Sequence, residues 1–163
     1  MKSPTSLVTT LKELQTSGAL PQRVLLRDTQ LATTIEIELL QLDRLSLEAS
    51  LLRVTPEKVP AETLRERATL LAQRVTGLME KLTVLEVDEA RGEALLRSDV
   101  PAAQDTQRRY YELLLQRNGT ATPHRYEGST LQSARKAIPF SITREAMAKL
   151  ISDLTHGSVV AAP

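Results

Sequence analysis

RYYELLLQRNGTATPHRY, residues 109–126, contains the strongest local structural signal in the chain. Two runs of strand-forming residues flank the dipeptide Asn118-Gly119. Asn-Gly is the preferred pair for a two-residue type I′ turn, because both positions of that turn need a positive φ. The sequence therefore predicts a β-hairpin with strands over 109–117 and 120–126.

The register of that hairpin determines which side chains meet across it. A two-residue turn places Tyr111 opposite Tyr126 as an aromatic pair. It also places Glu112 opposite Arg125, and both kinds of cross-strand pair stabilise a sheet. Pro123 has no N–H to donate to a neighbouring strand, so we expect the second strand to lie at an edge or to end soon after it.

Residues 22–54 contain no Gly, Pro or Asn, which would suit one long helix, yet their apolar residues alternate with polar ones. Alternation is the period of a half-buried strand, whereas a helix with this pattern would need partners on two sides. We therefore predict strands over 33–40 and 44–53, with one long helix as the alternative. A further hairpin is predicted over 82–98, where Gly92 supplies the positive φ at the end of the turn.

Capping residues and apolar spacing predict three helices: one before Gly18, one over 60–80 and one capped by Thr143. The apolar stripe of the middle helix consists of Leu64, Ala68, Leu71, Val75, Leu78 and Leu82. A single stripe means a single buried face, as for a helix that lies on a sheet. Residues 99–107 and 127–139 are interpreted as connections.

These elements predict an α+β fold, an antiparallel sheet built from β-hairpins with helices packed on one face. The length of 163 residues fits a single domain over 1–163. Within it we expect an N-terminal helix and linker at 1–21, an α+β core at 22–156 and a loose tail at 157–163.

The composition excludes several classes of site. Its 21 basic and 20 acidic residues give a net charge of +1, so no global field attracts nucleic acid or anionic lipid. The absence of cysteine removes disulfides, thiolate chemistry and cysteine-ligated metals. No stretch approaches the ~18 apolar residues of a membrane span, and the N-terminus lacks the apolar run of a secretory signal. We therefore expect a cytoplasmic protein with no membrane contact.

No catalytic, cofactor-binding or metal-binding motif is recognisable, so we expect neither an enzyme nor a cofactor. His124 is expected to be a structural sheet residue and His156 a C-terminal helix cap. The chain also lacks a nucleophile motif and a glycine-rich phosphate loop. Four carboxylates surround the predicted turn of the 82–98 hairpin: Glu86, Asp88, Glu89 and Glu93. They could bind a divalent cation, but a solvated turn is the simpler interpretation.

The candidate binding surface is the segment 106–142, which holds all four aromatic residues of the chain. Its six basic residues oppose two acidic ones, a local net charge of +4. Tyrosine rings and guanidinium groups on a sheet can stack bases and hold phosphates, or hold an acidic peptide. The competing interpretation is that the tyrosines fill the core and the arginines line solvated strand faces. The residues predicted to bind a partner are Arg109, Tyr111, Arg117, Arg125 and Tyr126.

Together these features favour a non-enzymatic interaction module, either a partner-binding adaptor or a chaperone-like subunit of a bacterial assembly. Helices on an antiparallel sheet are similar in outline to small secretion-chaperone folds, which would imply a protein partner. Edge strands that could pair with a partner strand, or with a second copy in a homo-oligomer, favour the same function. The alternative is a nucleic-acid-binding domain that uses the Tyr/Arg sheet surface, and an enzyme with a dispersed site is the least favoured hypothesis.

Overall fold

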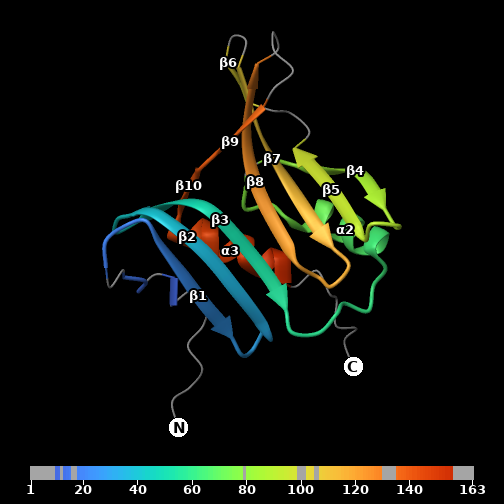
Figure 1. The fold of residues 1–163 in the computed structure, drawn as a ribbon, viewed down its shortest axis with the longest axis horizontal. Helices are drawn as coiled ribbons and strands as arrows, with labels where there is room; N and C mark the ends of the chain where they lie inside the picture. Colours follow the sequence, from blue (N-terminus) through green and yellow to red (C-terminus); the bar gives the residue numbers. More distant parts are fainter. Residues whose placement is uncertain are drawn as a thin grey trace.

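The computed structural model describes residues 10–11, 13–15, 18–78, 80–98, 102–104, 107–129 and 135–155. Over these residues the chain forms one antiparallel sheet and two helices (Figure 1). The elements in order are β1 (Gln22–Asp28), β2 (Thr33–Leu42), β3 (Ser46–Pro56), α2 (Leu64–Arg74), β4 (Leu82–Asp88), β5 (Glu93–Ser98), β6 (Ala102–Gln104), β7 (Gln107–Gln116), β8 (Ala121–Ser129), β9 (Arg135–Ile138), β10 (Phe140–Thr143) and α3 (Arg144–Thr155).

The strands follow the order β1-β2-β3-β8-β7-β5-β4, and three shorter strands pair beside this path, β10 with β3, β6 with β7 and β9 with β8. The α+β class and the antiparallel sheet are therefore confirmed. The predicted strand pair β2–β3 and the hairpins β4–β5 and β7–β8 are present. A single bridge between Val54 and Ala121 joins β3 to β8, so the sheet consists of two halves that meet at a narrow seam.

Strands β2 and β3 resolve the ambiguity of residues 22–54 in favour of strands. Ile35, Ile37 and Leu39 are fully buried along one face of β2, as the alternation predicts. Strand β1 is an addition that the sequence pattern did not predict. Its outward face carries an apolar residue, Leu25, which blurs the alternation between buried and exposed positions.

Both described helices begin at a capping threonine. In α2, the Thr63 side chain accepts a hydrogen bond from the Glu66 N–H (3.2 Å), and the Glu66 carboxylate accepts one from the Thr63 N–H, which forms a capping box. In α3, Thr143 Oγ1 accepts from the Ala146 N–H (3.0 Å), as predicted. Helix α2 is shorter than the predicted 60–80, because the capping box delays its start and the chain becomes extended at its C-cap.

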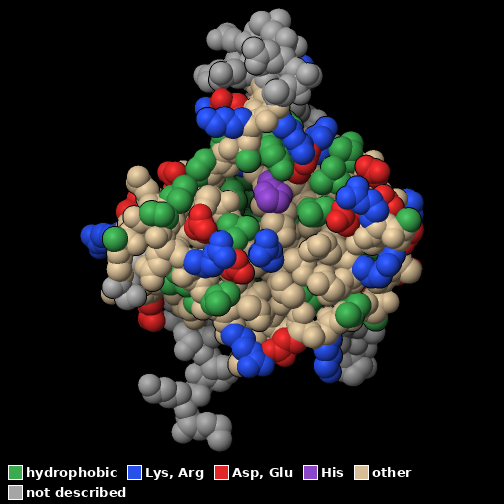
Figure 2. All heavy atoms as spheres, viewed as in Figure 1, with side chains coloured by type: hydrophobic (Ala, Val, Ile, Leu, Met, Phe, Trp, Pro, Cys, Tyr) green, Lys and Arg blue, Asp and Glu red, His purple; other side chains and the backbone are tan. Residues whose placement is uncertain are grey.

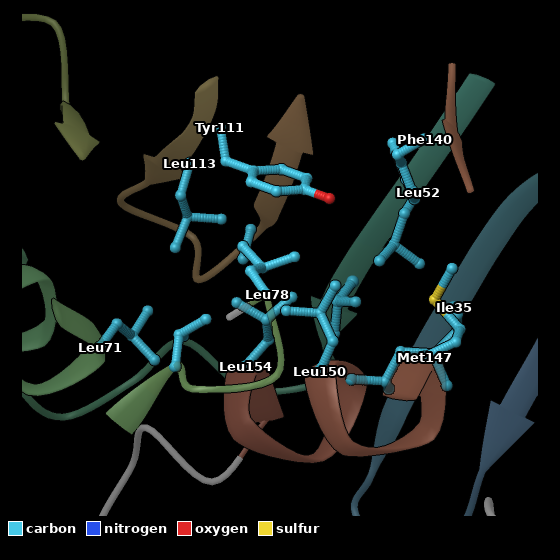
Figure 3. Packing of buried hydrophobic residues seen from close by; sticks show 14 of the residues in the cluster. Ile35, Leu52, Leu71, Leu78, Tyr111, Leu113, Phe140, Met147, Leu150 and Leu154 are labelled. Atoms are coloured by element: carbon cyan, nitrogen blue, oxygen red, sulfur yellow. The ribbon is translucent and has the colours of Figure 1, made fainter. Parts of the chain in front are cut away.

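The core fills the space between the strands and α3 (Figure 3). It joins Ile35 of β2 and Leu113 of β7, one from each half of the sheet, with Met147 and Leu150 of α3. The apolar stripe predicted around α2 is buried in the same core. Helix α3 contacts β3 and β10, whereas α2 contacts β4, β5 and β7. That both helices share one face of the sheet stays a prediction.

Two buried arginines fix turns to the helices. Arg67 of α2 donates to the carbonyl of Gly119 in the β7–β8 turn (3.3 Å) and to that of Leu154 in α3 (3.2 Å). Arg144 donates to the carbonyl of Asp43 in the β2–β3 turn (2.6 and 3.0 Å). Because burying a guanidinium group without partners is costly, these bonds hold both turns in defined positions.

Two predicted connections contain strands. Residues 99–107 include β6, and residues 127–139 include the end of β8 and all of β9. These pieces are too short to carry an alternating pattern, and β9 forms because β8 has a free edge where it leaves β3. The predicted N-terminal helix before Gly18 lies mostly outside the described residues, as do His156 and the tail at 157–163.

Pro123 lies in the middle of β8. Strand β8 bridges to β3 at Ala121 only, and its pairing with β9 begins at Arg125. Pro123 therefore occupies the gap between the two neighbours, where its missing N–H leaves no ladder bond unmade. The predicted edge is present at this position, but the strand continues to Ser129 because β9 replaces β3 as its partner.

Candidate functional site

The Asn118-Gly119 turn forms with a three-residue loop in place of the predicted two-residue loop. The Gln116 N–H donates to the Thr120 carbonyl (2.9 Å), and the Gly119 N–H donates to the Gln116 carbonyl (2.8 Å). Within the turn only Gly119 has a positive φ, +100°, the arrangement of a type I turn followed by a left-handed glycine. A Cβ atom at this glycine would lie 2.4 Å from Pro56 Cγ, so the packing around the turn also requires glycine.

The longer loop shifts the hairpin register by one residue. Tyr110 faces Tyr126, and Tyr111 faces Arg125. The predicted pair of Tyr111 with Tyr126 is therefore wrong. The predicted pair of Glu112 with Arg125 is wrong for the same reason. Because side chains alternate along a strand, the shift places Tyr111 and Tyr126 on opposite faces of the hairpin.

Three residues on the core side of the hairpin form what we call the inner cluster: Tyr111, Arg125 and Glu80. Tyr111 is 9% exposed, and the Arg125 guanidinium lies 4.3 Å from its ring centre. Arg125 Nη1 lies 3.2 Å from Glu80 Oε2, and these two side chains are 17% and 18% exposed. Burial raises the pKa of Tyr111. One cation opposes one carboxylate here, so the inner cluster is neutral and largely enclosed.

The face of β5, β7 and β8 that is turned away from the core is the outer face. Five side chains on this face lie around the Glu112 carboxylate and form the outer cluster with it: Arg97, Tyr110, His124, Tyr126 and Arg135. Strand β5 brings Arg97 opposite Glu112, and β9 brings Arg135 to the same carboxylate. Glu112 is only 2% exposed on this face, because its neighbours cover it.

The Glu112 carboxylate binds two guanidinium groups through one oxygen. Glu112 Oε1 accepts hydrogen bonds from Arg97 Nε (3.0 Å) and Nη2 (2.6 Å). It also accepts from Arg135 Nη1, which in addition donates to the Tyr110 hydroxyl (3.4 Å). The bonds to Tyr110 and Glu112 raise the pKa of Arg135. The carboxylate therefore fixes both arginines side by side.

Two tyrosine rings support the paired arginines. The Arg135 guanidinium lies 3.9 Å from the ring centre of Tyr126. The Arg97 guanidinium lies 5.1 Å from that of Tyr110, and both distances are within the range of cation–π attraction. The two ring centres are 5.8 Å apart. The side chains of Arg97 and Arg135 remain 39% and 42% exposed, so both cations reach solvent.

His124 lies across the hairpin from Glu112, with its ring centre 5.9 Å from that of Tyr126. Partial burial lowers the pKa of His124, and the charges of Arg135 and Arg53 act in the same direction. The Glu112 carboxylate opposes this shift without reversing it. The histidine is therefore neutral at neutral pH and adds no charge to the outer cluster.

The outer cluster has more cation than anion and has donors to spare. Arg97 and Arg135 oppose a single carboxylate, Glu112, which leaves a net charge of +1. Among the described residues, no hydrogen bond involves Nη1 of Arg97, or Nε and Nη2 of Arg135. Guanidinium N–H groups of this kind bind carboxylate or phosphate oxygens. The arrangement can therefore hold an anionic group from solution.

The predicted binding residues separate into four places. Tyr126 alone belongs to the outer cluster, whereas Tyr111 and Arg125 belong to the inner cluster. Arg109 pairs with Glu127 (2.8 Å) and is 56% exposed in its side chain. Arg117 lies at the β7–β8 turn, where it donates to the Glu89 carbonyl.

Sequence reasoning missed Arg97, Tyr110, Glu112 and Arg135 as members of one cluster. The spacing of Tyr110 and Glu112 along one strand was a usable signal, but the wrong register assigned them to different partners. Arg97 belongs to another hairpin, and no local pattern indicates that β5 pairs with β7.

The four carboxylates around the β4–β5 turn do not form a metal-binding group in the described structure. Gly92 has the predicted positive φ, +71°, and Asp88 Oδ1 accepts from the Arg91 N–H (3.0 Å). Across the residues that the structure describes, no three His, Cys, Asp or Glu side chains are grouped to hold a metal ion. In the same residues, neither helix is long and apolar enough to cross a membrane.

Comparisons of the chain with protein-family models, with curated protein sequences and with solved structures find no match.

Proposed function

We propose that the protein is a non-enzymatic interaction module, a cytoplasmic adaptor or chaperone-like subunit of a bacterial assembly, whose outer cluster holds an anionic group of a protein partner. The observation that carries the proposal is the sharing of one Glu112 oxygen by Arg97 and Arg135. That sharing orients both cations before a ligand arrives, so a ligand loses less free energy in ordering them.

The charge distribution favours a single anionic group over a polyanion. In the view of Figures 1 and 2 the strands lie in front of α3, so the outer face is turned to the reader. Acidic, basic and apolar side chains are interspersed over this view, with no continuous basic band (Figure 2). Nucleic-acid binding usually needs such a band, because each bound phosphate requires a cation. A protein partner needs only one or two carboxylates at the outer cluster.

A nucleic-acid-binding domain is the second candidate. The neighbouring rings of Tyr110 and Tyr126, with an arginine on each, are the feature that supports it. This site differs from the one predicted from the sequence. It keeps Tyr126, but uses Tyr110, Arg97 and Arg135 in place of Tyr111, Arg109, Arg117 and Arg125. It requires single-stranded substrate, whose bases can stack on the exposed guanidinium planes.

Fluorescence anisotropy tests the proposal with two labelled octapeptides, one with two adjacent Glu residues in a Ser/Gly background and one with Gln in their place. At about 50 mM salt, where exposed charges are weakly screened, we expect the Glu peptide to bind about fivefold tighter or more. The double variant Arg97→Ala/Arg135→Ala should abolish that preference. The matched control Arg109→Ala/Lys136→Ala removes two cations from β7 and β9 on the other face and should retain it.

Two results would overturn this assignment. Equal binding of the two peptides by the wild-type protein would show that the outer cluster does not select an anionic group. Binding of a labelled 12-nucleotide thymidine strand that depends on Arg97 and Arg135, with no binding of either peptide, would replace the proposal by the nucleic-acid alternative.

A further inference from the structure

An acidic, an apolar and a basic side chain lie in a row on the outer face of β5. Glu93, Leu95 and Arg97 alternate outward along this strand and are each partly exposed. Leu95 lies directly opposite Leu114 of β7, whose side chain is also partly exposed. Because alternate residues of a strand are about 6.6 Å apart, the acidic and basic ends of this row are separated by about 13 Å, with the two leucines between them.

A shallow hollow of about 200 Å³ lies at the acidic end of the row. Its lining residues are Glu86, Asp88, Arg91, Glu93, Ala94, Leu95 and Leu114. Across the described residues, Glu86 and Glu93 take part in no ion pair. Their charges are therefore available to a cation from outside.

The side chains around the hollow carry a net negative charge. Four carboxylates belong to this end, Glu86, Asp88, Glu89 and Glu93. The cations beside them are Arg91, which lines the hollow, and Arg117, whose side chain contacts Glu89. Four negative and two positive charges leave a net charge of −2 here, against +1 at the outer cluster.

We propose that the strip from Glu93 to Arg97 binds a short segment of a protein partner that carries an acidic residue, an apolar residue and a basic residue in that order or its reverse. The acidic residue contacts Arg97 and Arg135, the apolar residue covers Leu95 and Leu114, and the basic residue contacts Glu93. This assignment rests on the proposed function and specifies the chemistry of the partner.

The opposed charges at the two ends favour a segment that carries both charges over other occupants of such a face. A nucleic-acid strand or an anionic membrane that reaches Arg97 is repelled by the net negative charge about 13 Å away. A purely acidic peptide gains the contacts at one end only. An extended segment spans the same distance with four residue steps, so its acidic and basic residues stand at positions i and i+4.

Binding of short acetylated and amidated peptides tests the strip. The bipolar peptides Glu-Ser-Leu-Ser-Lys and Lys-Ser-Leu-Ser-Glu cover both chain directions, and Glu-Ser-Leu-Ser-Gln keeps the acidic end alone. We expect one bipolar peptide to bind the wild-type protein about threefold tighter than the acidic peptide, the effect of one exposed ion pair. Glu93→Gln should remove this difference. The control Glu89→Gln, in the adjacent β4–β5 turn and outside the hollow, should keep it.

Failure of this inference is distinguishable from failure of the proposed function. If the bipolar and acidic peptides bind equally, and binding of both is lost in Arg97→Ala/Arg135→Ala, the strip does not select a basic residue although the outer cluster still binds an anion. If no peptide binds, both the inference and the proposed function fail.

Discussion

The inner and outer clusters lie on opposite faces of the β7–β8 hairpin and both contain tyrosine, arginine and glutamate, yet they differ in charge balance and in access to solvent. In the inner cluster Arg125 pairs with Glu80, and both are mostly buried. In the outer cluster two arginines share Glu112, and each arginine is about two-fifths exposed. In a buried ion pair the two charges neutralise each other, so neither is available to a ligand. An arginine in excess of the carboxylates, held in place and exposed to solvent, is suited to bind an external anion.

The turn at Gly119 creates this difference, because its loop length decides which tyrosine faces the core. Gly119→Ala should therefore produce the largest effect, a loss of about 3 kcal/mol in the free energy of unfolding. The new Cβ would meet Pro56 Cγ at 2.4 Å, and φ is +100°. Urea denaturation followed by circular dichroism measures this loss in the free energy of unfolding. Gly128→Ala is the control, since the nearest atom there is 3.8 Å away, and a comparable loss in both variants would contradict the account.

The sequence predicted the elements of this fold better than it predicted their pairing. Alternation located β2 and β3, the apolar stripe located α2, and Thr143 located the start of α3. These signals are local, because each depends on residues within one element.

The register of the β7–β8 hairpin depends instead on tertiary contacts. The Asn118-Gly119 dipeptide permits both a two-residue and a three-residue loop, and Pro56 and the bond from Arg67 to the Gly119 carbonyl accompany the longer one. The outer cluster was beyond sequence reasoning for the same reason. Its two arginines come from β5 and β9, whose positions beside β7 and β8 no local pattern encodes.

Protonation of His124 on the outer face has a smaller effect on stability. The folded pKa of His124 is lowered from its ordinary value of 6.5, mainly by burial, so the unfolded chain binds a proton more readily. The stability that neutral His124 provides is fully present above pH 6.5, the pKa of the unfolded chain. It is lost as the pH falls from 6.5 towards the lower pKa of the folded protein. We expect the unfolding free energy of the wild type to fall from pH 7.5 to about 5.5, and to fall less in His124→Gln. Equal slopes in the two proteins would contradict the lowered pKa of His124 in the folded protein.

The most direct test of the account measures both stability and binding in Arg125→Ala and Arg135→Ala. Arg125→Ala should lower the unfolding free energy by about 2 kcal/mol, because Glu80 loses its buried partner, and its folded fraction should bind the Glu octapeptide like the wild type. Arg135→Ala should change stability by less than about 1 kcal/mol and weaken that binding about fivefold or more. The reverse pattern, with binding lost in Arg125→Ala and stability lost in Arg135→Ala, would contradict the division of the hairpin into a structural face and a binding face.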